Sequence, residues 1–183
     1  KAAPGGACKN YTDDYWTEIR RNTYANIAQI DDYIGEILEA ADDACGENLV
    51  VVFAADHGEL LGNHGLWGKN SCAYEDVLNI PLLVRYPLAK GASRADARVM
   101  TTDIFPTVLK AAGVEPVSCD GMDLADDVAR GGVRYTFAEG EEFVTVSDGR
   151  YKYIQAKKDG SEFYEMFDME NDPEQTTDVA EKY

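Results

Sequence analysis

The residues with the clearest chemistry lie together in the stretch VVFAADHGELLGNHGLWGKN, residues 51–70. Five apolar residues lead directly into Asp56 and His57, and both histidines of the chain fall within this stretch. A carboxylate and an imidazole on adjacent residues can bind one metal ion if the backbone turns sharply, and Gly58 permits such a turn. An Asx-type turn with a solvated histidine is the alternative, because so short a motif recurs by chance.

A lysine at the far end of the same stretch adds a positive charge. Lys69 follows Asp56 by thirteen residues, across a loop with glycines at 58, 62, 65 and 68. A loop of this flexibility can return the ammonium group to face the metal and clamp an anionic group. A solvated loop lysine is the alternative. His64 is expected to support the site or to cap the loop, and Trp67 to anchor the loop on apolar surface.

A long helix is predicted before this stretch. Thr12 and the two aspartates after it supply helix N-cap chemistry. Apolar residues then recur at spacings of three and four, which places them on one face. These residues are Ile27, Ile30, Ile34, Ile37 and Leu38. We expect the helix to span residues 13–43 and to end near Gly46, where a glycine can adopt a left-handed conformation.

A strand is predicted directly before Asp56. Residues 49–54 form a continuous apolar run rich in β-branched side chains, typical of a strand buried on both faces. A long helix followed by such a strand is half of a β-α-β unit, which favours a parallel sheet. In open α/β sheets ligands bind beyond the carboxyl ends of the strands, where Asp56 and His57 stand. The strand also needs neighbours on both faces that this sequence does not supply.

The second half of the chain changes in texture. Residues 80–87 predict a short strand bounded by prolines, and residues 102–112 a helix that starts at a Thr-Asp cap. From about residue 134, short alternating segments separated by Asp-Gly turn signals predict an antiparallel meander. The sequence therefore predicts an α/β part, residues 1–130, and a small antiparallel β subdomain, residues 131–183.

Aromatic side chains are concentrated in the predicted subdomain. We expect them to form the dry face and the ends of the small sheet, under a neighbouring helix, because aromatic cross-strand pairs stabilise sheets. A sugar-binding aromatic platform is the alternative. The residues are Tyr135, Phe137, Phe143, Tyr151, Tyr153, Phe163, Tyr164 and Phe167.

The composition excludes several classes of partner. The 17 basic and 34 acidic side chains give a net charge of -17, so nucleic acid and anionic lipid surfaces are not expected to bind. An anionic substrate would need a local positive group, such as a metal ion or a lysine. No apolar run approaches the roughly 20 residues of a membrane span. The four cysteines contain no Cys-x-x-Cys pair, which disfavours a zinc site.

Seven segments in order carry a resemblance to a known family. They are YANIAQIDDYIG (24–35), VVFAADHGE (51–59), NHGLWGK (63–69), IPLLV (80–84), TDIFPTVL (102–109), GRYKYI (149–154) and FDMENDPE (167–174). Together they resemble the C-terminal part of a type I sulfatase of the alkaline-phosphatase-like superfamily. The resemblance implies the C-terminal portion of an α/β sandwich, followed by a small antiparallel sheet subdomain with a helix.

The resemblance also implies roles for the site residues. Asp56 and His57 would be two ligands of a single divalent cation, usually calcium in sulfatases, and Lys69 would contact the sulfate of the substrate. The substrate would be a small sulfate ester or a sulfated carbohydrate. A phosphonate monoester or phosphodiester hydrolase of the same superfamily, or a non-catalytic binding module, are the alternative functions.

Parts of the family's pattern are missing from these 183 residues. Sulfatases of this type use a formylglycine made from a cysteine or serine in a C/S-x-P/A-x-R motif, and two further aspartates near the N-terminus complete the metal site. The motif does not occur here, and no N-terminal Asp-Asp pair follows an apolar strand. We therefore expect an N-terminal part of the same protein to be a partner. Alone, the chain should hydrolyse no sulfate ester and bind calcium weakly or not at all, because calcium prefers six to eight oxygen ligands.

Overall fold

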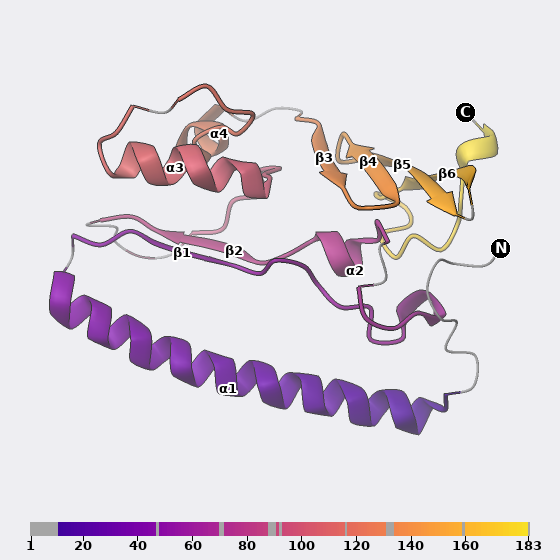
Figure 1. The fold of residues 1–183 in the computed structure, drawn as a ribbon, viewed down its shortest axis with the longest axis horizontal. Coiled ribbons are helices and arrows are strands. Elements are labelled where there is room, and N and C mark those ends of the chain that lie inside the picture. Colours follow the sequence, from indigo (N-terminus) through magenta and orange to yellow (C-terminus); the bar gives the residue numbers. More distant parts are fainter. Residues whose placement is uncertain are drawn as a thin grey trace.

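The computed structural model describes residues 11–46, 48–69, 72–87, 91, 93–115, 117–130, 134–158 and 160–182. In chain order the elements are α1 (Asp13–Cys45), β1 (Val51–Ala54), η1 (Asn63–Gly65), α2 (Glu75–Leu78), β2 (Leu82–Arg85), η2 (Thr101–Asp103), α3 (Ile104–Ala111), α4 (Leu124–Arg130), β3 (Thr136–Glu139), β4 (Phe143–Ser147), β5 (Tyr151–Lys158), β6 (Ser161–Asp168) and η3 (Ala180–Lys182). Figure 1 shows α1 along one long side, β1 and β2 between α1 and the α3–α4 pair, and the β3–β6 sheet at one end.

Helix α1 confirms the predicted helix and runs two residues further. The Thr12 hydroxyl accepts a hydrogen bond from the Tyr15 N–H at 3.3 Å, as an N-cap should. At the other end Gly46 has a φ of 61°. The predicted apolar stripe is not covered, since α1 has no buried residue and Ile37 is 66% exposed. In the described part of the chain, no helix is long and apolar enough to cross a membrane.

Strands β1 and β2 lie where they were predicted, but their pairing differs from the prediction. They are antiparallel, with Val51 opposite Arg85 and Ala54 opposite Leu82, because the chain reverses direction between them. The prediction of a parallel arrangement for this strand was therefore wrong. Phe53 of β1 is 37% exposed, so the neighbours that a strand buried on both faces needs are not among the described residues.

The small antiparallel sheet confirms the predicted meander, with strand order β3-β4-β5-β6. The aromatic residues do not share one face, because side chains alternate along a strand. Phe143 and Phe167 are buried on the inner face, whereas Phe137 and Tyr164 are 63% and 46% exposed. The inner face packs against Tyr74 and its neighbours at α2. A helix therefore covers the buried aromatic residues, as predicted, but not the exposed ones.

Helix α2 lies between two hydrophobic clusters. One joins Ala73 to the inner face of the small sheet, and the other joins Leu60, Leu66, Cys72 and Val77. Partly buried Tyr74 and Leu78 pack against both clusters. The small sheet and the loop that follows β1 are therefore packed together through one short helix.

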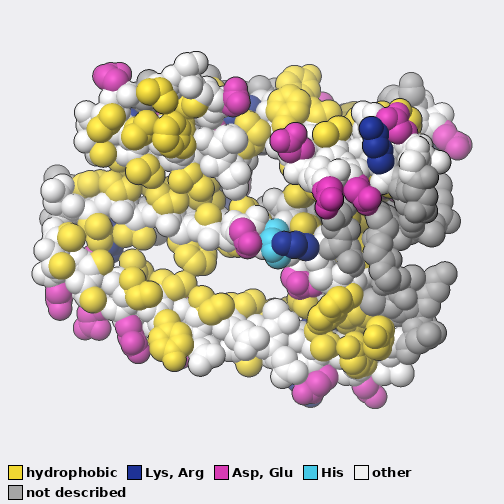
Figure 2. Space-filling view, viewed as in Figure 1, with side chains coloured by type: hydrophobic (Ala, Val, Ile, Leu, Met, Phe, Trp, Pro, Cys, Tyr) yellow, Lys and Arg dark blue, Asp and Glu magenta, His cyan; other side chains and the backbone are white. Residues whose placement is uncertain are grey.

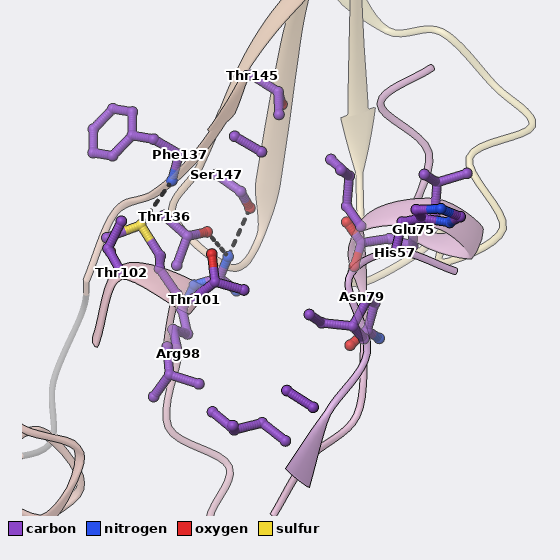
Figure 3. A pocket seen from close by; sticks show the side chains of 18 of the residues that line it. His57, Glu75, Asn79, Arg98, Thr101, Thr102, Thr136, Phe137, Thr145 and Ser147 are labelled. Atoms are coloured by element: carbon purple, nitrogen blue, oxygen red, sulfur yellow. Dashed lines mark hydrogen bonds between the residues drawn. The ribbon is translucent and has the colours of Figure 1, made fainter. Parts of the chain in front are cut away.

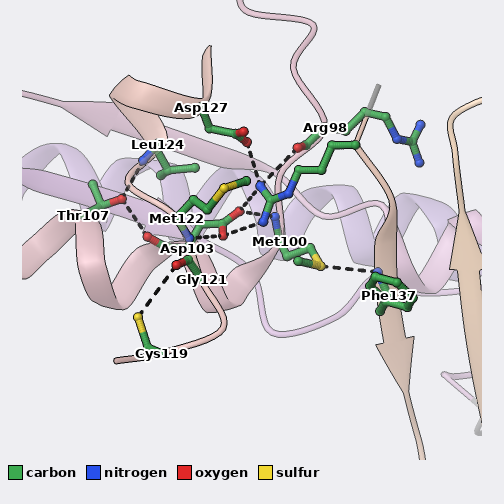
Figure 4. A network of polar contacts seen from close by, with 11 residues as sticks. Arg98, Met100, Asp103, Thr107, Cys119, Gly121, Met122, Leu124, Asp127 and Phe137 are labelled. Carbon is green, nitrogen blue, oxygen red and sulfur yellow. Dashed lines mark hydrogen bonds and ion pairs between the residues drawn. The ribbon is translucent and has the colours of Figure 1, made fainter. Parts of the chain in front are cut away.

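A buried ion-pair network fixes α3, α4 and the start of the small sheet (Figure 4). The Arg134 guanidinium pairs with Asp103 through two bonds, at 2.7 and 2.8 Å, and with Asp127 at 2.6 Å. Arg134 also donates to the Arg98 carbonyl at 3.3 Å. Burial raises the pKa of Asp103, but the hydrogen bonds from Arg134, Met100 and Met122 outweigh it, and the pKa is lowered. The proposed domain boundary adjoins residues 131–133, which lie outside the described residues, as does Cys8.

Candidate functional site

The turn after β1 is held by close backbone contact with α2. The Gly58 N–H donates to the Val77 carbonyl at 2.8 Å. A Cβ added at Gly58 would lie 2.0 Å from the Asp76 carbonyl oxygen, far inside van der Waals contact. Glycine is therefore required here by the approach of two backbones, and the position of α2 fixes the position of the turn.

Asp56 and His57 present two metal-ligating atoms side by side. The His57 Nδ1 lies 2.8 Å from the Gly58 carbonyl, so Nδ1 carries the proton in the neutral imidazole and Nε2 keeps its lone pair. His57 Nε2 lies 3.5 Å from Asp56 Oδ2. Adjacent ligands about 2.4 Å from a cation are about 3.4 Å apart at right angles, so this pair fits two positions of one coordination shell. Among the described residues no group of three such side chains could hold a metal ion.

A cavity of about 1220 Å³ lies beside this turn, and both Asp56 and His57 line it. Figure 3 shows that the cavity has two walls. His57 and Glu75 stand on one wall, and Arg98 and Ser147 stand on the other, near the small sheet. The predicted ligands thus face a space large enough for a small organic molecule.

Two cationic side chains that were not predicted as site residues, Lys152 and Arg98, also line the cavity. Lys152 is 2% exposed, and its Nζ donates to Glu75 Oε1 at 2.6 Å. Burial lowers the pKa of the Lys152 ammonium, an effect that the charge of Glu75 opposes. Arg98 donates through Nη2 to the Thr136 and Ser147 hydroxyls at 3.0 and 2.9 Å. Lys152 lies on β5 of the small sheet, and Arg98 is hydrogen-bonded to residues of β3 and β4.

The loop after the turn closes on itself near Lys69. The Leu60 N–H donates to the Gly68 carbonyl at 3.2 Å, which places Lys69 at the base of the loop. The Lys69 side chain is exposed and is not among the residues that line the cavity. Figure 2 shows a histidine between an acidic and a basic side chain at the edge of the hollowed centre of this face. The contact of Lys69 with sulfate stays a prediction.

His64 and Trp67 pack within or against the loop. His64 has a φ of 55° and stacks on Tyr74 with ring centroids 3.9 Å apart, and its Nε2 lies 3.3 Å from Asp76 Oδ2. The Trp67 ring lies 5.8 Å from that of Trp16 in the first turns of α1. His64 therefore ties the loop to α2, and Trp67 ties it to α1.

The signals for the missed residues were weak. Lys152 shares its strand face with Ile154 and Ala156, both buried, so the period of two places it inside the sheet. Its partner Glu75 lies 77 residues away, a pairing that no local pattern shows. Asp127, the second of two adjacent aspartates, also has no local sign of burial, yet it is 8% exposed and pairs with Arg134.

Two family models match the chain. The model described as Sulfatase matches residues 4–114, and the model described as N-sulphoglucosamine sulphohydrolase, C-terminal, matches residues 62–183. Together they cover all of the elements described above.

Several named proteins are similar to the chain. Arylsulfatase K of Xenopus laevis is 30% identical over 93% of this chain, and choline-sulfatase of Rhizobium meliloti is 29% identical over 93%. N-acetylglucosamine-6-O-sulfatase of Bacteroides thetaiotaomicron is 31% identical over 91%. The matched parts make up 35%, 35% and 33% of those proteins, so the chain spans about a third of their length.

A solved structure supports the fold. It comes from work on the metabolism of multiple glycosaminoglycans by Bacteroides thetaiotaomicron. It matches 85% of this chain and 38% of its own chain, with a TM-score of 0.65 and 23% sequence identity. The mixed α/β architecture with two antiparallel sheets is therefore shared with that structure.

Proposed function

The chain belongs to the sulfatase family, and from that premise we propose that the protein containing it hydrolyses sulfate esters at the cavity beside Asp56 and His57. The observation that carries the proposal is the turn itself. A carboxylate oxygen and an imidazole nitrogen lie 3.5 Å apart at the end of a strand and face this cavity. In a chain of net charge -17 an anionic substrate needs a local positive centre, which a cation held by this pair would supply.

The proposed roles follow from the chemistry of each side chain. Asp56 and His57 hold a divalent cation, and calcium is the ion that the resemblance to type I sulfatases implies. When bound, the cation withdraws charge from the sulfate oxygens. Because Nδ1 donates to the Gly58 carbonyl, His57 would have Nε2 available to bind the ion. Lys69 supplies a second positive charge to the sulfate, which stabilises the charge that develops during ester cleavage.

The attacking oxygen is proposed to come from another part of the protein. A formylglycine formed in a C/S-x-P/A-x-R motif would supply it, and the 183 residues contain no such motif. The relatives are about three times as long as the parts that match, which leaves room for this motif and for further cation ligands. The missing ligands matter because two donors are too few for calcium.

The substrate class is proposed from the relatives and the cavity. One relative is described as a choline-sulfatase and another as an N-acetylglucosamine-6-O-sulfatase. A cavity of about 1220 Å³ would accept either a small alkyl ester or a sulfated sugar. We therefore propose a small sulfate ester or a sulfated carbohydrate as the substrate.

The test is Lys69→Ala in the complete protein, assayed with an aryl sulfate. Loss of a charge-stabilising donor should lower kcat/KM by about 100-fold. Lys157→Ala is the control. Lys157 is not among the residues that line the cavity, and it pairs with Glu162 at 3.5 Å on the surface. Full activity of Lys69→Ala would argue for a non-catalytic module. A faster reaction with an aryl phosphonate would argue for the related phosphonate or phosphodiester hydrolases.

A further inference from the structure

The Asp56–His57 turn depends on helix α2 for its position. Gly58 donates to the Val77 carbonyl at 2.8 Å, and its backbone leaves no room for a Cβ beside the Asp76 carbonyl. A shift of α2 would therefore move the turn with it. Helix α2 has only four residues, and so short a helix does not hold itself in place.

Two buried side chains from distant parts of the chain hold α2 at Glu75. Lys152 of β5 donates to the Glu75 carboxylate at 2.6 Å. Gln175, which is 3% exposed, accepts a hydrogen bond from the Glu75 N–H at 2.7 Å through its side-chain oxygen. The first residue of α2 is thus fixed by the small sheet on one side and by the C-terminal tail on the other.

The chemistry of the Lys152–Glu75 pair favours a positional role over a contribution to stability. Lys152 is 2% exposed, and taking an ammonium out of water costs about as much as the pairing returns. An apolar pair of similar volume would satisfy the packing equally well. An ion pair differs from an apolar pair in that it sets one distance and one direction between the two elements.

We propose that Lys152 and Glu75 are positioning residues, which hold α2 so that the Asp56–His57 turn presents its two ligands to the cavity. Figure 3 shows Glu75 and His57 on the same wall, and Lys152 lines the same cavity. The small sheet therefore orders the site without contributing a ligand. The link to a cation rests on the function proposed above, whereas the link to the turn rests on the contacts alone.

The test compares Lys152→Met and Lys157→Met in the complete protein. Both lysines lie on β5, but Lys157 is 66% exposed and pairs at the surface. In Lys152→Met the Gly58 amide should exchange its hydrogen at least about tenfold faster, measured by mass spectrometry. Calcium should bind about 10- to 100-fold more weakly by calorimetry, as when partners behind a metal ligand are removed. Lys157→Met should change neither value, and Lys152→Arg should recover part of both.

A double variant keeps the proposal testable if Lys152→Met fails to fold. Lys152→Met combined with Glu75→Leu removes both charges and should fold, because no buried charge is left unpaired. A positioning role requires that this variant still shows fast Gly58 exchange and weak calcium binding. Recovery of both values together with the fold would overturn the proposal. If the unaltered protein binds no calcium, the proposed cation site fails, while Gly58 exchange still decides whether the pair positions the turn.

Discussion

Gly58 shows how strongly the candidate site depends on the absence of one side chain. The residue follows His57 directly, and its nearest neighbour is a backbone oxygen of α2 that cannot rotate away. The sequence alone predicts that Gly58 permits a sharp turn. The structure adds a steric reason, because a methyl group would overlap the Asp76 carbonyl at 2.0 Å.

Gly58→Ala is expected to lower the free energy of unfolding by about 1–3 kcal/mol, as overpacking in a tight contact does. Gly35→Ala in the middle of α1 is the matched control, because a Cβ there meets nothing within 4 Å. That change should raise the free energy of unfolding by about 0.5–1 kcal/mol. Urea unfolding measures both. Equal effects of the two substitutions would show that α2 does not press on the turn.

The candidate site was predictable from the sequence in part. Asp56 and His57 are adjacent and follow a strand directly, so the local pattern suffices to identify them as candidates, whereas the role of Lys69 stays a prediction. Lys152 was not predictable as a cavity residue, because its partner Glu75 belongs to a different element far along the chain. Local sequence patterns predict which side chains lie together within one turn. They do not predict which distant side chains the packing of the fold brings together.

At the scale of elements, the long helix and the strands were predicted, whereas the short helices α2 and α4 were not. Helix α1 was identified because its cap and its spacing agree over 33 residues. Helices α2 and α4, with four and seven residues, give no comparable signal. The pairing of β1 was predicted wrongly, because an apolar run predicts burial but does not specify the partner strand or its direction.

The Arg134 network joins elements that no sequence pattern connects. It should also make the free energy of unfolding depend on pH. Because the pKa of Asp103 is lowered in the fold, the unfolded chain takes up this proton first as the pH falls below 3.8. The free energy of unfolding should therefore fall with the pH in this range and be fully retained above it. Asp103→Asn should remove part of this acid dependence. It should also cost about 3–5 kcal/mol at neutral pH, because Arg134 loses a buried partner.

Urea unfolding at neutral and acid pH measures this effect. Asp96→Asn is the control, because Asp96 pairs with Arg94 at the surface, where the side chains are 86% and 91% exposed. Such a pair contributes at most about 1 kcal/mol. An acid dependence that is identical in Asp103→Asn and Asp96→Asn would exclude Asp103 as its source.

At the scale of the whole molecule, exposed apolar side chains are concentrated on α1 and on the strands that face it. Figure 2 shows hydrophobic side chains along the inner side of α1 and along the strands that face it across the hollowed centre. Ile27 and Ile30 of α1 are each 54% exposed, and Leu83 of β2 is 59% exposed. Monomeric proteins rarely leave such continuous apolar faces in water. Since the chain spans about a third of its relatives, we propose that further sequence of the same protein covers these faces.

Ile30→Asp tests this proposal because its effect should depend on how much of the protein is present. In the 183-residue chain the substitution should change the free energy of unfolding little, since Ile30 is half exposed and α1 has no buried residue. In the complete protein it would bury an unpaired carboxylate and cost several kcal/mol, on the order of 3–5. Glu36→Gln, on the exposed surface of α1, should have little effect in either form. Thermal and urea unfolding of both forms give the comparison. An equally small effect of Ile30→Asp in the complete protein would mean that this face of α1 stays open to solvent, and that the covering sequence lies elsewhere.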